Sequence, residues 1–511
     1  MAELTPMMQK YMETKEQYKD CILFYRLGDF YEMFFEDAVV ASRELEIALT
    51  GKSCGLEERA PMCGIPYHAV EGYLTKLVSR GYKVAICEQV EDPKLAKGLV
   101  KREVIRVVTP GTNLNVQSLE ASKNNYLMCI AYTSDGIGIS AADVTTGDYY
   151  VTEVEDLRKL NDELMKYEPS EIICNEAFLV SGFDVADLKS RLHISVNALE
   201  SHMFDDDGCR RILMKHFKVN TLIGLGIEEF PTGILAAGAL LQYLYDTQKT
   251  DLEHFTHIYP YLTSKYMLLD SSTRRNLELT ETLREKQKRG SLLWVLDKTK
   301  TAMGARLLRS CIEQPLIEKE EMEKRLDAIQ ELNQDSISRD EIREYLNPIY
   351  DLERLLSKVT YKTANPRDLI AFRNSLQMLP PIKTVLSAFQ KEELTKIREQ
   401  IDGLEDIYRL IEEAIIDEPP LSIREGGMIK DGFDETIDRL RSAKHDGKQW
   451  LAQLEEEDRE RTGIKNLKIK YNKVFGYYFE VTNSYKDLVP EDYIRKQTLA
   501  NAERYTTPRL K

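Results

Sequence analysis

The sequence of 511 residues lacks several features that would assign it to particular protein classes. No stretch approaches the about 18 consecutive apolar residues of a membrane span, and Met1 to Asp20 is too charged for a signal peptide. The eight cysteines include no Cys-x-x-Cys pair, which argues against a zinc ribbon or a disulfide framework. Asp and Glu (85) outnumber Lys and Arg (70), and the formal net charge of −15 excludes a wholly basic nucleic-acid coat. We therefore expect a soluble cytoplasmic protein whose positive surface is local.

The composition is otherwise that of an ordinary globular protein, with 42% hydrophobic and 30% charged residues. At roughly 100 to 200 residues per domain, the length predicts three to five domains. The first region alternates helix and strand, which predicts a small α/β domain. Its expected helices are residues 6–18, 36–49 and 70–80, and its expected strands are residues 22–27, 30–34, 83–86 and 104–108.

A second α/β region begins near Tyr126. Three short consecutive strands are expected at residues 126–132, 136–142 and 146–154, and we expect them to form a meander. A helix at 157–165, a strand at 171–174 and a helix at 233–247 follow, and this order predicts a sheet covered by helices.

The third region, residues 265–418, has almost no strand signal and predicts long amphipathic helices. Its apolar residues between Leu394 and Ile415 follow alternating three- and four-residue steps, which predicts a coiled-coil seam over about three heptads. A second helical run follows Pro419-Pro420, and a β-hairpin is expected from residues 467–471 and 477–481. Residues 464–511 hold ten Lys or Arg against five Asp or Glu, so positive charge concentrates around this hairpin.

Phe30 and Glu32 are the first candidate site residues. Aromatic residues in a hairpin usually fill a core, and that interpretation stays open here. However, Phe30 follows the tight turn Gly28-Asp29, and Glu32 shares its strand face because side chains on a strand repeat every two residues. An apolar wedge can enter the minor groove of DNA and unstack a base step, while a carboxylate disfavours general phosphate contact. The pair therefore suggests a reader of defects in duplex DNA.

Four ordered blocks make the chain resemble the MutS family of DNA mismatch-repair proteins over essentially its whole length. The first is Phe30-Tyr31-Glu32 within Gly-Asp-Phe-Tyr-Glu, and the second is the expected loop Gly64 to Ala69. The third comprises the helices around Asp270 to Arg284 and Leu292 to Arg309. The fourth resembles the family's clamp: Tyr471-Asn472, Gly476-Tyr477-Tyr478, Arg495 to Thr498 and Asn501 to Tyr505.

The resemblance implies a role for individual residues. Phe30 would stack on a mispaired base from the minor groove, and Glu32 would hydrogen-bond that base. The candidates for contacts to the DNA backbone are the polar residues of the clamp, although each is also compatible with a solvated strand face: Lys468, Lys470, Asn472, Lys473, Arg495, Lys496 and Gln497.

The resemblance also implies a multidomain fold that combines α/β domains with an all-α part. We expect a small mixed α/β mismatch-binding domain, an RNase H-like connector, and a long-helix core or lever domain with an inserted α+β clamp. The corresponding ranges are 1–114, 115–250, 251–426 and 427–500, with residues 501–511 beginning a returning lever helix that is truncated at Lys511.

The family's ATPase motif does not occur in these residues. A P-loop needs Gly-x-x-x-x-Gly-Lys-[Ser/Thr], and at the only Gly-Lys-Ser, Gly51-Lys52-Ser53, Glu46 stands in place of the first glycine. We therefore expect no enzyme activity in this chain, with ATP and Mg²⁺ used by an absent C-terminal domain.

The expected partners are double-stranded DNA with mismatches or small insertion/deletion loops, a second copy in a homodimer, and a MutL-type repair protein bound through the connector and core. The expected location is the cytoplasm, in association with the nucleoid.

Four alternatives are weighed against this hypothesis. A protein-interaction scaffold with only non-specific DNA binding stays open. A zinc site at Cys54, Cys63 and His68 matches no standard spacing. A two-metal nuclease at Asp135, Asp143 and Asp148 is disfavoured because Asp135 and Asp148 stand in turn sequences and a further carboxylate block is not evident. A recombination paralogue is disfavoured because such proteins lack the Phe30 and Glu32 pair or its domain.

Overall fold

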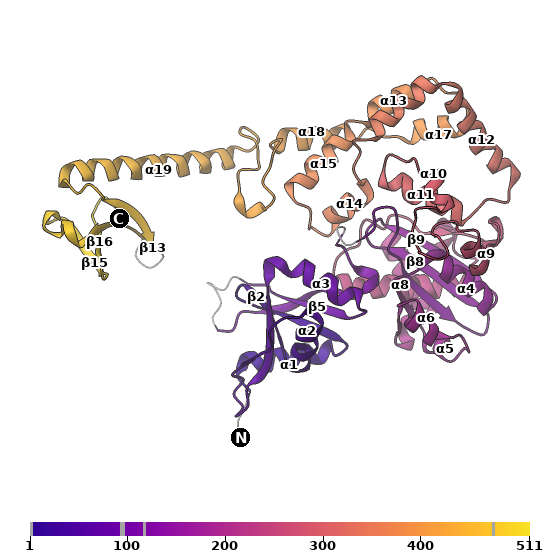
Figure 1. Ribbon diagram of the computed structural model, residues 1–511, viewed down its shortest axis with the longest axis horizontal. Helices are drawn as coiled ribbons and strands as arrows, with labels where there is room; N and C mark the ends of the chain where they lie inside the picture. The colour runs from indigo at the N-terminus through magenta and orange to yellow at the C-terminus, as the bar shows by residue number, and fades with distance from the viewer. Residues whose placement is uncertain (1–3, 92–97, 116–118, 473–475, 511) are drawn as a thin grey trace. The chain divides into compact units, whose positions relative to one another are not determined.

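The computed structural model describes residues 4–91, 98–115, 119–472 and 476–510. The chain forms two compact units, residues 1–411 and residues 412–511. Figure 1 shows the elements of both units. The combination of sheets and many helices is that of a multidomain protein with α/β and helical parts. The predicted domain boundaries near residues 114, 250 and 426 stay predictions.

The N-terminal region of the first unit contains a six-stranded sheet in the order β3-β4-β2-β1-β5-β6. Its strands are β1 (Cys21–Leu27), β2 (Phe30–Phe34), β3 (Thr50–Lys52), β4 (Ala60–Pro66), β5 (Lys83–Gln89) and β6 (Arg102–Val108), and its helices are α1 (Pro6–Gln17), α2 (Phe35–Leu45) and α3 (Val70–Ser79). The predicted strands and helices of this region are confirmed, except that the helix expected to reach residue 49 ends at Leu45, where Glu46 takes a left-handed φ of 58°. Strand β3 was not predicted. The segment expected to be a loop from Gly64 is instead the end of β4 followed by one helical turn at Tyr67–Ala69, because residues 62–66 of β4 pair with the whole of β2.

Alternation along β1 and β2 divides the apolar side chains between two faces of this sheet. Phe24 and Tyr31 face one side and are buried with residues of α2 and α3. Tyr25 and Phe34 face the other side and are buried with Met8 and Tyr11 of α1, among others. Gly28, at φ 58°, permits the two-residue turn that joins the strands antiparallel, with Leu27 opposite Phe30.

The second sheet has the order β11-β10-β7-β8-β9-β12. Its strands are β7 (Leu127–Tyr132), β8 (Ile137–Asp143), β9 (Asp148–Val154), β10 (Glu171–Cys174), β11 (Ser195–Ala198) and β12 (Tyr259–Pro260). The helices of this region are α4 (Leu157–Tyr167), α5 (Glu176–Leu179), α6 (Val185–Arg191), α7 (Asp206–Phe217) and α8 (Pro231–Gln248). The predicted meander β7-β8-β9 is confirmed. The largely buried helix α8 packs directly on it, because Gly138 has no side chain where a Cβ would lie 1.9 Å from the Thr232 carbonyl oxygen.

The region that follows is helical, as predicted: α9 (Ser271–Asn276), α10 (Leu292–Leu296), α11 (Ala302–Glu313), α12 (Lys319–Gln334), α13 (Ser336–Leu346), α14 (Leu352–Thr360), α15 (Pro366–Leu376), α16 (Leu379–Leu386), α17 (Glu392–Gln400) and α18 (Glu405–Ala414). The prediction that these helices are long is wrong: they have between 5 and 16 residues, because capping side chains such as Asp335, Asp351 and Asn365 begin new helices. The predicted continuous seam from Leu394 to Ile415 is wrong. It is divided between α17 and α18, because the Asp402 carboxylate accepts a hydrogen bond from the Leu404 backbone N–H and Leu404 takes a left-handed φ of 46°.

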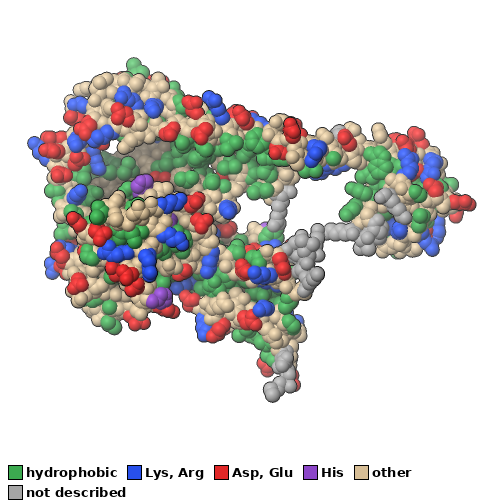
Figure 2. Space-filling view, turned by 180° about the vertical axis from the view of Figure 1, so that it is seen from behind, with side chains coloured by type: hydrophobic (Ala, Val, Ile, Leu, Met, Phe, Trp, Pro, Cys, Tyr) green, Lys and Arg blue, Asp and Glu red, His purple; other side chains and the backbone are tan. Residues whose placement is uncertain are grey.

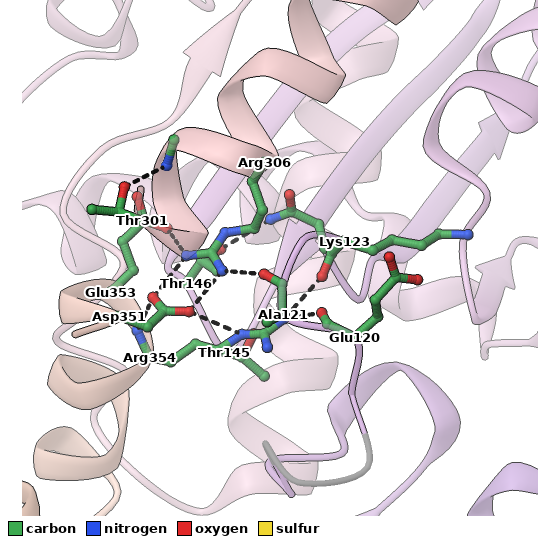
Figure 3. A network of polar contacts seen from close by, with 12 residues as sticks. Glu120, Ala121, Lys123, Thr145, Thr146, Thr301, Arg306, Asp351, Glu353 and Arg354 are labelled. Atoms are coloured by element: carbon green, nitrogen blue, oxygen red, sulfur yellow. Dashed lines mark hydrogen bonds and ion pairs between the residues drawn. The ribbon is translucent and has the colours of Figure 1, made fainter. Parts of the chain in front are cut away.

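A buried polar network joins the helical region to the chain segment that precedes β7 (Figure 3). Arg306 of α11 donates to both Asp351 oxygens, to Glu353 and to the Ala121 carbonyl. Arg354 of α14 is 2% exposed and donates to the carbonyls of Glu120 and Lys123. Carboxylates and a carbonyl compensate the Arg306 guanidinium, whereas Arg354 donates through Nη2 and its buried Nε and Nη1 lack hydrogen-bond partners among the described residues. These contacts fix the helical region against the segment 120–123.

The second unit contains the long helix α19 (Glu435–Thr462), which Gly463 ends at φ 70°. It is followed by a four-stranded antiparallel sheet in the order β13-β14-β16-β15, made of β13 (Lys468–Asn472), β14 (Gly476–Thr482), β15 (Ile494–Thr498) and β16 (Ala502–Thr506). The predicted hairpin is confirmed as β13 and β14. The predicted helix start at residue 501 is wrong, because residues 502–506 pair on both sides within the sheet and bury Ala502 and Tyr505.

Candidate nucleic-acid interface

Phe30 lies at the first position of β2, directly after the turn, and its side chain is 47% exposed. The other aromatic side chains of this hairpin, among them Phe24, Tyr25 and Phe34, are almost completely buried. Helix α1 covers Tyr25 and Phe34 on the same face of the sheet, and Phe30 stands beyond that cover. The core interpretation of the hairpin is therefore correct for its other aromatic residues and does not hold for Phe30.

Glu32 lies two residues further along β2, on the face of Phe30. On the neighbouring strand β4 its partner in register is Gly64. A Cβ at Gly64 would lie 3.6 Å from the Glu32 Cγ and 4.0 Å from the Phe30 Cδ1, so both groups pack directly beside the Gly64 backbone. Lys52 of the edge strand β3 lies 2.5 Å from the Glu32 carboxylate.

The turn that carries Phe30 is held from the opposite face of the sheet. The Arg26 guanidinium donates to the Gly28 carbonyl at 2.6 Å and lies 3.7 Å from the centroid of the Tyr67 ring. The Tyr31 hydroxyl donates to Glu88, and burial together with this carboxylate raises the pKa of Tyr31. These contacts fix the backbone on both sides of Phe30, so its side chain projects from a rigid support.

In the second unit, three of the predicted contact residues share the solvent face of the sheet. Register places Lys468 opposite Glu480 and Lys470 opposite Tyr478, and places Gln497 opposite Arg504. The Lys470 ammonium and the Arg504 guanidinium flank Glu480 at 2.6 and 3.5 Å, and they lower the pKa of the Glu480 carboxyl group. Arg504 also donates to the Gln497 side chain at 2.8 Å. Lys468 remains an exposed cation on the same face.

The other predicted contact residues are placed differently. Arg495 pairs with Tyr505 in register and its guanidinium lies 3.5 Å from Glu503, on the face that carries the apolar core of this unit. Lys496 is exposed at the register shift of β15, and Asn472 ends β13. Lys473 lies outside the described residues. The structure therefore brings Lys468, Lys470 and Gln497 together with Arg504, and separates Arg495 from them.

Lys52 and Arg504 are two cationic residues at these surfaces that the sequence patterns do not select. Lys52 was considered only as part of Gly51-Lys52-Ser53, and the structure places Gly51 and Lys52 within β3. Arg504 belongs to the block Asn501 to Tyr505, which had been used for the family resemblance alone. A two-residue alternation through residues 502–506 is the signal that would have placed Arg504 on a strand face.

The alternative sites are not assembled by the fold. Asp135 stands in the turn between β7 and β8, at the opposite end of β8 from Asp143 and Asp148. Asp143 is fully buried and accepts hydrogen bonds from Asn124, Asn125 and Thr145.

Cys54 and Cys63 are buried in different apolar clusters, on opposite faces of the first sheet. Burial raises the pKa of the Cys63 thiol to about 12. Within the ranges that the structure describes, no group of three or more His, Cys, Asp or Glu side chains is arranged to hold a metal ion. In the same ranges, no helix is both long and apolar enough to cross a membrane.

Comparison with known proteins assigns the family. The model of MutS domain I matches residues 5–117, that of MutS domain II matches residues 125–256, and that of MutS domain III matches residues 272–502. The chain belongs to the MutS family. Phe30 and Glu32 therefore lie in the MutS domain I match, and the sheet of the second unit lies largely in the MutS domain III match.

Several MutS proteins are similar to this chain over its entire length. The DNA mismatch repair protein MutS of Lachnoclostridium phytofermentans is 67% identical over 511 residues, which are 100% of this chain and 55% of the relative. Those of Ruminiclostridium cellulolyticum and Acetivibrio thermocellus are 55% and 54% identical, again over 100% of this chain and over 58% and 59% of the relatives. The chain thus spans somewhat more than half the length of these MutS relatives.

Proposed function

We propose that this MutS-family chain binds double-stranded DNA at mismatched or unpaired bases as part of DNA mismatch repair. Phe30 would enter the minor groove and stack on the defective base, and Glu32 would accept a hydrogen bond from that base. Unstacking a base step costs a few kcal/mol and costs least where pairing is already defective. Preference for the defect would therefore arise mainly from local deformability of the DNA.

The observation that carries this proposal is the exposure of Phe30. The Phe30 side chain is 47% exposed next to a turn that Arg26 holds by a hydrogen bond, whereas Phe24 and Phe34 nearby are 0% and 1% exposed. When a large apolar side chain that is held rigidly in solvent becomes buried against a base, the free energy of the complex is lowered.

The clamp residues would supply affinity that does not depend on sequence. Lys468, Lys470 and Gln497 share one strand face with Arg504. Cationic side chains on such a face bind phosphates and release counterions, so this part of the affinity should weaken steeply with salt. Asn472, Lys473 and Lys496 are proposed as further backbone contacts on the strength of the family resemblance, whereas Arg495 lies on the other face of the sheet and is not included.

Several further properties are proposed from the family. They are a homodimeric assembly, an RNase H-like connector that binds a MutL-type partner together with the core, and a cytoplasmic, nucleoid-associated location. ATP and Mg²⁺ are proposed to act in a domain outside residues 1–511, so residues 1–511 would bind DNA without catalysing a reaction. No step proposed for Phe30 or Glu32 depends on ATP.

The test is equilibrium binding of the chain to a duplex with one G·T mismatch, a duplex with one unpaired T, and the matched homoduplex, at low and moderate salt. The wild-type chain should prefer both defective duplexes. Phe30→Ala should abolish the preference and retain much of the salt-sensitive binding. A Phe30→Ala variant with wild-type preference would show that Phe30 is not the wedge.

An interaction scaffold is the second candidate function, and exposed apolar side chains of the helical region favour it. Leu326 and Ile329 of α12 are 62% and 60% exposed, and Ile337 of α13 is 81% exposed. Figure 2 shows apolar side chains interspersed with charged ones over the helical region. Exposed apolar patches mark protein contacts. Equal, salt-sensitive binding to all three duplexes, together with a change of oligomeric state on Leu326→Glu, would favour the scaffold.

A further inference from the structure

Lys52 is the nearest cation to the proposed base-reading carboxylate. Its ammonium donates to Glu32 Oε2 at 2.5 Å and lies 5.6 Å from the centroid of the Phe34 ring. Lys52 comes from the edge strand β3, and its side chain crosses β4 to reach β2. The residues of β4 that stand opposite Lys52 and Glu32 in register are Ala60 and Gly64, and Met62 lies between them on the same face.

The ion pair is partly exposed, with 33% of the Lys52 side chain and 17% of the Glu32 side chain accessible. Pairs of this kind alter an equilibrium constant by no more than about fivefold, so a competing partner can break this one at small cost. The ammonium nevertheless cancels the Glu32 charge locally, at the surface where DNA phosphates would approach.

The Lys52–Glu32 ion pair has a different effect in the proposed complex with mismatched DNA and in the complex with intact duplex. On a mismatch, Glu32 has a base edge as its partner. On intact duplex no base edge is available to Glu32, and its charge repels the phosphates unless a cation compensates it. Lys52 therefore supports binding to intact duplex more than binding to a mismatch.

From this geometry, and on the basis of the proposed function, we infer that Lys52 is a specificity-determining residue. As the counter-charge of Glu32 it raises overall affinity and limits discrimination. An ordinary phosphate-binding lysine would instead raise the affinity for both duplexes equally, whatever residue stands at position 32.

The experiment measures dissociation constants of the full 511-residue chain for the G·T duplex and the homoduplex. Lys52→Met should weaken binding to both and increase the ratio of homoduplex to mismatch dissociation constants by up to about fivefold. Lys52→Arg, which keeps the charge, should retain the wild-type ratio. In a Glu32→Gln background, Lys52→Met should leave the ratio unchanged.

Lys83→Met is the matched control, because Lys83 also pairs with a carboxylate, Asp20, at 3.0 Å. Lys83 is the first residue of β5 and pairs in register with Cys21, at the opposite end of β1 from the turn before Phe30. This variant should leave the ratio unchanged. Thermal unfolding of each variant checks that it is folded.

The inference is overturned if Lys52→Met leaves the ratio unchanged or lowers it, or if the ratio rises equally in the Glu32→Gln background. Failure of the proposed function has a different signature. In that case the wild-type chain does not prefer the G·T duplex, or Phe30→Ala retains the preference, and the inference falls with it.

Discussion

The Arg306 guanidinium contacts both carboxylate oxygens of Asp351, at 2.7 and 2.8 Å. Arg306 is 5% exposed and Asp351 18%, so the pair is shielded from solvent as well as bidentate. Figure 3 shows that the same guanidinium reaches the Ala121 carbonyl, which lies 185 residues earlier in the chain. A single side chain of α11 thus connects α14 with the segment that leads into the second sheet.

Arg306→Ala is expected to lower the free energy of unfolding by about 3 to 5 kcal/mol, because it leaves the Asp351 carboxylate largely buried without its partner. Urea unfolding measures this change. The matched control is Arg409→Ala, which removes an exposed pair with Glu405 and should change stability by less than about 1 kcal/mol. Equal effects of the two substitutions would show that the Arg306 network does not stabilise the first unit.

Glu32→Ala is expected to raise the affinity for homoduplex relative to mismatch, because a charge that repels phosphate is removed together with the proposed partner of the base. The comparison is made on G·T and matched duplexes at one salt concentration, since affinity depends on salt. A homoduplex affinity that falls in this variant contradicts the proposed role.

Lys468→Ala should weaken binding to all duplexes alike and reduce the slope of log K against log salt by about 0.9, the value for one lost phosphate contact. Arg495→Ala is the control, because Arg495 lies on the other face of the sheet and pairs with Glu503. It should reduce the slope by less than Lys468→Ala does. The reverse order would assign the DNA-facing surface to the side of Arg495.

Asp148 makes a contribution to folding stability that depends on pH with the opposite sign to that of an ordinary paired carboxylate. Burial and the nearby Asp143 raise the pKa of Asp148 from 3.8 to about 6. The folded state therefore retains a proton that the unfolded state releases, so this contribution to stability is full below about pH 4 and is lost as pH rises through about 6. A shift of about two pK units limits the effect to about 3 kcal/mol.

Asp148→Asn should remove this loss and make the chain more stable than wild type at pH 7, while the acceptor oxygen toward Asn124 and Thr146 is kept. Unfolding by urea between pH 4 and 7.5 measures both effects. If the variant is less stable than wild type at pH 7, the Asp148 carboxylate is stabilising in its charged form.

Much of the architecture follows from local patterns in the sequence. Two-residue alternation and the Gly28-Asp29 turn determined the hairpin β1-β2, and the same alternation determined β13-β14. Phe30 and Glu32 could be selected as a pair because strand geometry puts residues i and i+2 on one face. Periodicity failed between Leu394 and Ile415, where Asp402 caps the backbone locally and interrupts an otherwise helical pattern.

The sequence by itself determined which residues stand next to each other along a strand or helix, because that depends only on backbone period. Only the tertiary structure decided which strands are neighbours where no short turn joins them. It brought Lys52 across β4 to Glu32, placed Arg504 beside Lys470, and separated Asp135 from Asp143 and Asp148. Such contacts depend on the order of strands in a sheet, which is set by the burial of whole faces and leaves no periodic signal in the chain.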